Sequence, residues 1–114
     1  MKGTVALLVA LGFAGAASGA EKAPAKADAA AGQAIVTKVC AACHGADGNS
    51  PTGPDFPRLA GQREDYLLKA LRDYKSGARK NAIMAGQAQA LTAKDVENLA
   101  AYYARQKPRA APAK

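Results

Sequence analysis

The chain has 114 residues and a formal net charge of +7 at pH 7, with four tyrosines, two phenylalanines and no tryptophan. This length allows one small domain, and so few aromatic side chains leave little material for a hydrophobic core. A buried prosthetic group would supply the missing apolar surface, so we expect the chain without one to fold poorly. Basic and aromatic residues are not interleaved, which argues against nucleic acid as a partner.

The N-terminal segment has the pattern of an export signal. Lys2 gives a positive start, residues 4–17 are apolar, and the small residues at positions 18–20 suit cleavage. We therefore predict a signal peptide over residues 1–20, and its removal would lower the net charge to +6 because Lys2 is lost. An uncleaved membrane anchor over residues 3–20 is the alternative.

Two segments without apolar periodicity flank the expected domain. Residues 21–30 consist of Ala, Lys, Pro and acidic residues, and residues 108–114 have a similar composition. Such segments cannot bury an apolar face, so we expect a flexible lead-in and a disordered tail. The folded domain is then expected over residues 31–107.

The first predicted helix, residues 31–42, leads into the most informative motif of the chain. The motif is the run Cys40-Ala41-Ala42-Cys43-His44, and Gly45 ends the helix. Two thiols three residues apart share one face of a helical turn, so both can form thioethers with the vinyl groups along one porphyrin edge. His44 follows directly, so its Nε2 is placed to bind iron while Nδ1 donates to a backbone carbonyl. One such motif predicts one covalent haem c.

Two other types of site use the same residue types. A Cys-x-x-Cys pair also forms thioredoxin-like dithiols, but these occur in a βαβ context that this sequence does not suggest. A structural zinc site needs four ligands, and with two cysteines and one histidine it would have to be completed by a carboxylate such as Asp47. Both remain alternatives to haem attachment.

The second predicted helix, residues 63–76, is amphipathic. Leu67, Leu71 and Tyr74 recur at helical spacing, and Gly77 follows the last turn. The helix starts with acidic residues and ends with a lysine, which suits the helix dipole.

The third predicted helix starts with a sequence similar to a capping box, Thr92-Ala93-Lys94-Asp95, and stops at Lys107-Pro108. Val96, Leu99 and Tyr103 line one of its faces. No segment alternates like a strand, so the predicted fold class is all-α, with three main helices around one haem.

Met84 is the candidate for the sixth iron ligand. His44 is the only histidine, and Met1 would be removed with the signal, so Met84 is the only thioether left in the mature chain. We expect it in the loop between the second and third helices, and the 40 residues after His44 give the chain enough length to reach the other side of the ring. The alternative is a Met that fills the core, its commonest role in a small domain.

These motifs together resemble a class I cytochrome c. The matching stretches are Cys40–His44, Pro57–Gln62 (PRLAGQ), Tyr66–Gly77 and Ile83–Gly86 (IMAG). The nearest resemblance is to small monohaem cytochromes related to each half of bacterial dihaem cytochromes c. It covers residues 31–106.

The resemblance implies roles for matching positions. In that family a proline carbonyl at the place of Pro57 accepts the His Nδ1–H, and a leucine at the place of Leu59 packs on the haem. The first and last helices of the family cross at a glycine, which corresponds to Gly32 here. The haem propionates need donors, for which the sequence offers several candidates. They are Tyr66, Arg72, Arg79 and Asn81.

The expected function follows from the ligands. If His44 and Met84 both bind iron, no open position remains for a substrate, so we predict a periplasmic one-electron carrier rather than an enzyme, with no small-molecule substrate. The basic surface would favour redox partner proteins with acidic docking sites on membrane complexes. We expect a monomer. An open-site haem sensor or peroxidase-like protein, and a fixed cytochrome subunit of a larger oxidoreductase, are the alternatives.

Overall fold

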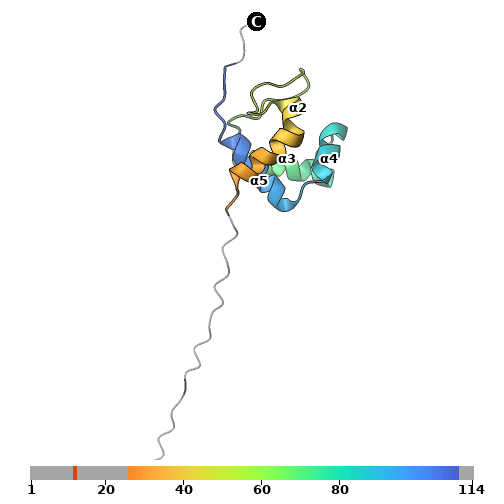
Figure 1. The fold of residues 1–114 in the computed structure, drawn as a ribbon. Helices are drawn as coiled ribbons and strands as arrows, with labels where there is room; N and C mark the ends of the chain where they lie inside the picture. Colours follow the sequence, from red (N-terminus) through yellow and green to blue (C-terminus); the bar gives the residue numbers. More distant parts are fainter. Residues whose placement is uncertain (1–11, 13–25, 111–114) are drawn as a thin grey trace, which may run out of the picture.

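The computed structural model of the protein describes Gly12 and residues 26–110. In this part of the chain helices form and no strand does, so the predicted all-α class is confirmed (Figure 1). The predicted signal peptide, apart from Gly12, lies outside the described residues, as do residues 21–25 and 111–114. The elements are α1 Ala29–Ile35, the π-helical segment η1 Val36–Cys40, α2 Ala41–His44, α3 Glu64–Ser76, α4 Ala82–Gln89 and α5 Ala93–Ala104.

The first three elements form one continuous N-terminal helix. It begins at Ala29, earlier than the expected residue 31, because the Asp28 carboxylate accepts the N–H groups of Ala30 (2.9 Å) and Ala31 (3.2 Å). It ends at Gly45, as predicted, where φ is 88°. The π-helical turn of η1 was not predicted, and no local sequence feature explains it. Cys40, the last residue of η1, and Cys43 and His44 on α2 therefore belong to one rigid element.

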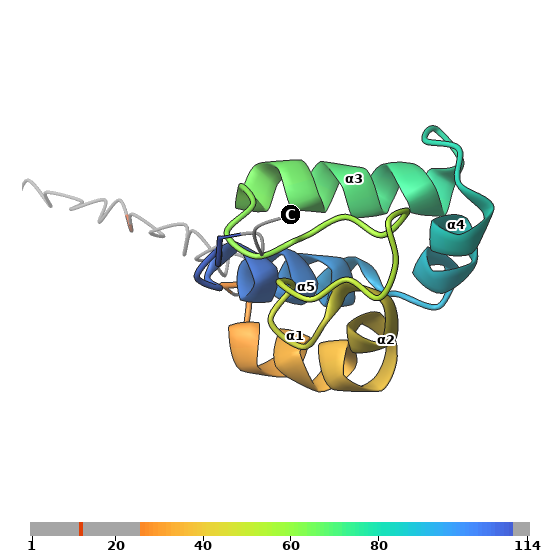
Figure 2. The same cartoon turned by 90° about the horizontal axis from the view of Figure 1, so that it is seen from above.

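Helix α5 lies between α1 and α3 (Figure 2). At the crossing with α1, Gly32 lets the two backbones approach so closely that a Cβ at this position would stand 2.1 Å from the carbonyl oxygen of Asn98. The Asn98 side chain accepts the N–H of Asp28 (2.8 Å), which ties the start of α1 to α5. The predicted crossing at Gly32 is therefore present.

The core is built from one face of each of these helices. Its buried cluster consists of Val36, Leu67, Leu99, Ala100, Tyr102 and Tyr103. Helix α5 begins with the predicted capping box, in which Thr92 Oγ1 accepts the N–H of Asp95 and the Asp95 carboxylate accepts the N–H of Thr92. It ends at Ala104, before the predicted stop at Lys107.

The prediction of a loop around Met84 was wrong. Residues 82–89 form helix α4, so the fold has one more helix than the three expected. Two features account for it: the Asn81 side chain caps the helix by accepting the N–H of Met84 (3.0 Å), and the helix packs against α3. Its sequence has no amphipathic pattern and contains Gly86, which is why periodicity did not reveal it.

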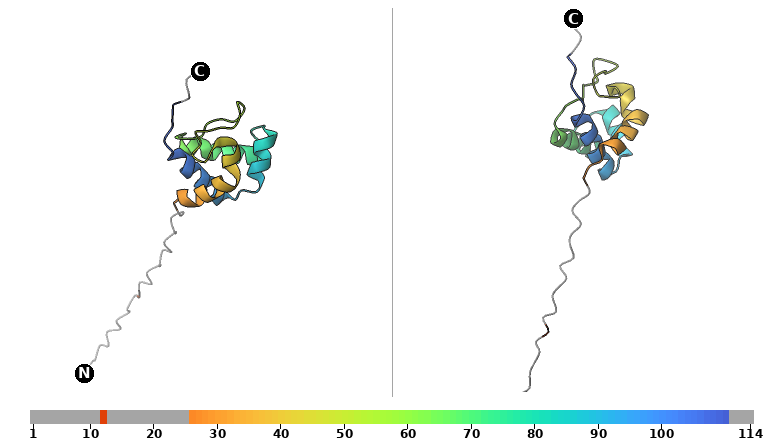
Figure 3. Two further views of the ribbon diagram at one scale, coloured as in Figure 1. Left: turned by 45° about the horizontal axis from the view of Figure 1, so that its top comes forward. Right: turned by 60° about the vertical axis from the view of Figure 1, so that its left-hand side comes forward.

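A long loop, residues 45–63, connects α2 to α3 without regular structure (Figure 3). After α5 the chain returns to this loop, and Arg109 hydrogen-bonds with Asn49, so the ordered contacts extend beyond the expected end at residue 107. Among the residues that the structure describes, no helix has the length and apolar character needed to cross a membrane.

Candidate haem site

A cavity of about 590 Å³ lies between the N-terminal helix, loop 45–63, α3 and α4. This volume is within the range of small-molecule and cofactor sites in proteins. All six site residues predicted from the sequence line this cavity. They are Cys40, Cys43, His44, Pro57, Leu59 and Met84.

His44 is buried, with 5% of its surface exposed, and its ring is held on two sides. Nδ1 lies 2.8 Å from the carbonyl oxygen of Pro57, and the ring of Phe56 approaches edge-on at 6.3 Å between centroids. A carbonyl oxygen can only accept a hydrogen bond, so this contact requires the proton on Nδ1. The lone pair then belongs to Nε2, the nitrogen that would bind a metal.

The two cysteines are free thiols, half-buried in the cavity wall. Burial raises the pKa of Cys40 to about 11, and its neighbour Cys43 adds to the effect. Reactive dithiols depend on a thiolate with a lowered pKa, so a raised one disfavours the dithiol alternative. Within residues 26–110 and at Gly12, no group of three or more His, Cys, Asp or Glu side chains is arranged to hold a metal ion.

Met84 lies on another element, α4, and lines the same cavity. It is half-buried and does not belong to the buried core cluster. Two side chains fix the position of helix α4: Gln89 Nε2 donates to the carbonyl oxygen of Lys75 (2.9 Å), and Asn81 caps the start of the helix. The thioether is therefore presented from a defined helix.

The donors proposed for the propionates separate into two groups. Tyr66, Arg79 and Asn81 line the cavity, whereas Arg72 does not. Arg79 Nη1 donates to the Tyr66 hydroxyl (3.1 Å), and its guanidinium stacks over the Tyr74 ring at 4.9 Å.

Arg58 and Gln62 also line the cavity, although neither was predicted to be a site residue. Arg58 follows Pro57 directly, which could have drawn attention to it. Gln62 is the last residue of the same matching stretch, PRLAGQ.

The chemistry of the lining fits a haem. Two thiols and an imidazole stand on one helix, a thioether stands on another, and apolar side chains from loop 45–63, α3 and α5 also line the cavity. The apolar members are Leu59, Leu67, Ala70, Leu71 and Leu99.

Comparison with known proteins agrees with this geometry. A family model described as cytochrome c matches residues 29–105. Cytochrome c4 of Pseudomonas aeruginosa is 52% identical over 103 residues, covering 90% of this chain and 47% of the relative. A thiosulfate dehydrogenase electron acceptor of Thiomonas intermedia is 49% identical over 74 residues, covering 65% of this chain and 34% of the relative.

A solved structure matches as well. The crystal structure of reduced recombinant cytochrome c4 from Pseudomonas stutzeri superposes with a TM-score of 0.66 at 47% identity, covering 72% of this chain and 47% of that one. The chain thus spans about half the length of the cytochromes c4 it matches. The predicted resemblance, the all-α fold and the haem c cofactor are confirmed, and the chain belongs to the cytochrome c family, a family of electron-transfer proteins rather than enzymes.

Proposed function

We propose that this protein is a periplasmic one-electron carrier with one haem c, attached through Cys40 and Cys43 and ligated by His44 and Met84. The observation that best supports this proposal is that all four side chains line one cavity of about 590 Å³. They come from two elements, the N-terminal helix and α4.

The haem supplies the one-electron chemistry when bound, and the chain determines what else can happen there. His44 offers Nε2 because its Nδ1–H donates to the Pro57 carbonyl oxygen, with 2.8 Å between Nδ1 and the oxygen. Met84 offers a soft thioether, which favours the reduced iron. If His44 and Met84 both bound the iron, no coordination position would be left for a substrate or a gas, and this would favour outer-sphere electron transfer.

The packing around the cavity supports rapid transfer. Leu67 and Leu99 are 5% and 1% exposed and belong to the same buried cluster, so the inner wall is formed by a close-packed core. Such a wall keeps water away from the site and changes little in shape when charge changes. A small reorganisation on oxidation or reduction is the property that a carrier needs.

The basic surface of the protein favours redox partners with acidic docking surfaces. Lys38, Lys75, Arg79 and Lys80 are exposed, and Arg79 also lines the cavity. These groups would steer the protein toward acidic docking surfaces, an attraction that salt screens. We therefore expect the rate of electron exchange with an acidic partner to fall as ionic strength rises.

A dehydrogenase-linked cytochrome subunit is the second candidate. The observation that favours it is the relative from Thiomonas intermedia, whose name is thiosulfate dehydrogenase electron acceptor. Stable copurification of this chain with a membrane or periplasmic oxidoreductase would favour the subunit over the free carrier.

The test is the visible spectrum and intact mass of the protein exported from a host with c-type maturation machinery. Haem mass that survives denaturation, a low-spin reduced spectrum and the weak far-red methionine–iron band are expected. Met84→Ala should abolish that band and allow carbon monoxide to bind the reduced protein. Ile83→Ala is the matched control, because Ile83 lines the same cavity from the same helix but has no ligand atom. A wild-type protein that is high-spin and binds carbon monoxide would contradict the carrier and favour an open-site sensor or peroxidase-like protein.

A further inference from the structure

The segment after α5 lies against the loop that carries Pro57. We call residues 106–109 the C-terminal strap. Its Pro108 occupies the space that Gly61 leaves free, since a Cβ on Gly61 would stand 2.4 Å from Pro108 Cγ. The strap begins where the family match ends, at residue 105, and is therefore outside the matched region.

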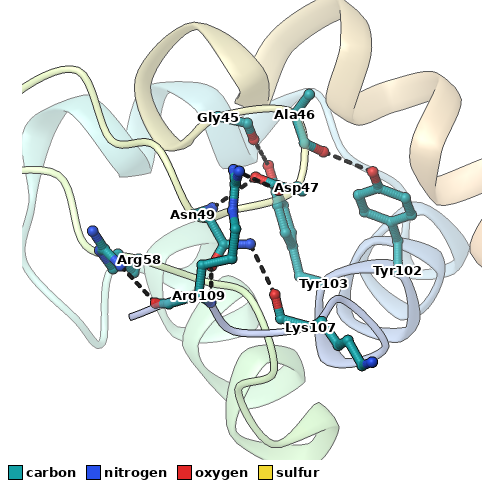
Figure 4. Close-up of polar contacts among 9 residues, drawn as sticks. All are labelled: Gly45, Ala46, Asp47, Asn49, Arg58, Tyr102, Tyr103, Lys107 and Arg109. Carbon is teal, nitrogen blue, oxygen red and sulfur yellow. Dashed lines mark hydrogen bonds and ion pairs between the residues drawn. The ribbon is translucent and has the colours of Figure 1, made fainter. Parts of the chain in front are cut away.

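Four polar contacts bind the strap to loop 45–63, and Figure 4 shows their arrangement. Asn49 Nδ2 donates to the carbonyl oxygen of Lys107 (2.9 Å), and the N–H of Arg109 donates to Asn49 Oδ1 (2.8 Å). Arg109 Nη2 pairs with Asp47 Oδ2 (3.0 Å), and Arg58 Nη1 donates to the carbonyl oxygen of Arg109 (2.9 Å). The strap therefore contacts the loop both near its beginning and at residue 58.

Asn49 is the central residue of this arrangement. Only 6% of its surface is exposed, and both ends of its amide hydrogen-bond with the strap. A buried amide that loses its partners is destabilising, so the loop conformation that buries Asn49 depends on the strap being in place.

These contacts lie on both sides, along the chain, of the Pro57 carbonyl group that orients His44. Asn49 precedes Pro57 in the loop, and Arg58 follows it directly. The position of the Pro57 carbonyl oxygen, 2.8 Å from His44 Nδ1, is thus restrained from both sides through the strap.

We propose that the C-terminal strap positions the Pro57 carbonyl and thereby sets the strength of the His44 Nδ1–H hydrogen bond, with Asn49 as the main positioning residue. The proposal rests on the proposed function, in which His44 is an axial ligand. A hydrogen bond accepted from Nδ1–H makes an imidazole a more basic ligand and stabilises the oxidised iron. Weakening it should therefore shift the reduction potential to more positive values.

The experiment uses the full holoprotein with Asn49→Ala, which removes both side-chain bonds to the strap without changing the charge. Two quantities are measured: the exchange rate of the His44 Nδ1–H with solvent, by NMR of the reduced protein, and the reduction potential. We expect exchange about tenfold faster or more, because two hydrogen bonds no longer oppose opening of the loop, together with a positive shift in potential.

Asn98→Ala is the matched control. Asn98 is also 6% exposed and bonds to a backbone group, but it lies on α5 at the crossing with α1, and its partner is the N–H of Asp28. It should lower stability while leaving the His44 exchange rate and the potential unchanged. Values for Asn49→Ala that match those of Asn98→Ala would overturn the proposal.

A second variant covers the case in which Asn49→Ala does not fold. A chain ending at residue 106 removes the rest of the strap and should give the same two changes. Its control is a chain ending at residue 110 with Lys107→Ala and Arg109→Ala, which loses the same basic side chains but keeps the backbone partners of Asn49. Equal values in these two chains would overturn the proposal. Failure of the proposed function would appear differently, as the absence of a low-spin spectrum in the unaltered protein.

Discussion

Replacing Gly32 with alanine tests the closest contact in the fold. The new Cβ would stand 2.1 Å from the Asn98 carbonyl oxygen and 3.0 Å from Tyr102 Cβ, so α1 and α5 would have to separate by roughly 1 Å. Overpacking of this kind costs about 1–3 kcal/mol, and here the obstacle is backbone, which cannot rotate away. Alanine recovers up to about 1 kcal/mol through its helix propensity.

We expect a net loss of about 2 kcal/mol in the free energy of unfolding, which in a domain of this size lowers the Tm by about 10 °C. The assay is denaturant and thermal unfolding of the holoprotein, followed by far-UV circular dichroism. Gly86→Ala is the control, because Gly86 is exposed on helix α4 and a Cβ there meets nothing within 4 Å. It should be stabilising by about 0.5–1 kcal/mol. If Gly32→Ala were as stable as Gly86→Ala, the close helix crossing would be refuted.

Three further predictions concern the helix cap, pH and the cofactor. Thr92→Ala should lower the unfolding free energy by about 1 kcal/mol because the Asp95 N–H loses its acceptor. Thr92→Ser keeps a hydroxyl acceptor and should retain most of the wild-type stability. Equal denaturation midpoints for the alanine and serine variants would contradict the cap. Hydrogen bonds from the Asn49 N–H and side chain, with the charge of Arg109, lower the pKa of Asp47. A carboxyl group whose pKa is lower in the folded state stabilises the fold fully above its unfolded pKa. The loss of stability in Asp47→Asn should therefore be full near neutral pH, should begin to shrink as the pH falls below about 4, and should vanish once the pH is below the lowered pKa of the folded state. A difference in midpoint that does not change with pH would exclude this linkage. Without haem, the apolar side chains that line the cavity would be exposed to water in a domain with few other core residues, so protein made without haem attachment should show no cooperative unfolding transition by calorimetry.

Much of the fold could be predicted from local sequence. The capping box at Thr92 and the periodic Leu67, Leu71 and Tyr74 identify α5 and α3, because these signals act within one or two turns of the chain. Helix α4 could not be found in this way. Its sequence has no amphipathic face, and its stability comes from the Asn81 cap and from packing against α3. Met84 was consequently expected in a loop.

The C-terminal strap could not be predicted from local sequence either, because its contacts join residues far apart in the chain. Asp47 and Arg109 are 62 residues apart, and nothing in either neighbourhood indicates that they pair. The composition of the C-terminal segment resembles that of a disordered tail, whereas in the structure residues 107–109 have fixed partners, among them the buried amide of Asn49.

The type of cofactor could be predicted from the sequence alone: the spacing of Cys40, Cys43 and His44 predicts covalent haem, because the reach of two thiols on one helical turn is a local property. A single histidine and a single internal methionine also limited the possible ligands. Only the tertiary structure decided how these groups meet. The contact between His44 and the Pro57 carbonyl, the side of the cavity from which Met84 approaches, and the strap that holds loop 45–63 all join residues distant in sequence. Such contacts depend on how the helices pack, and local patterns do not encode them.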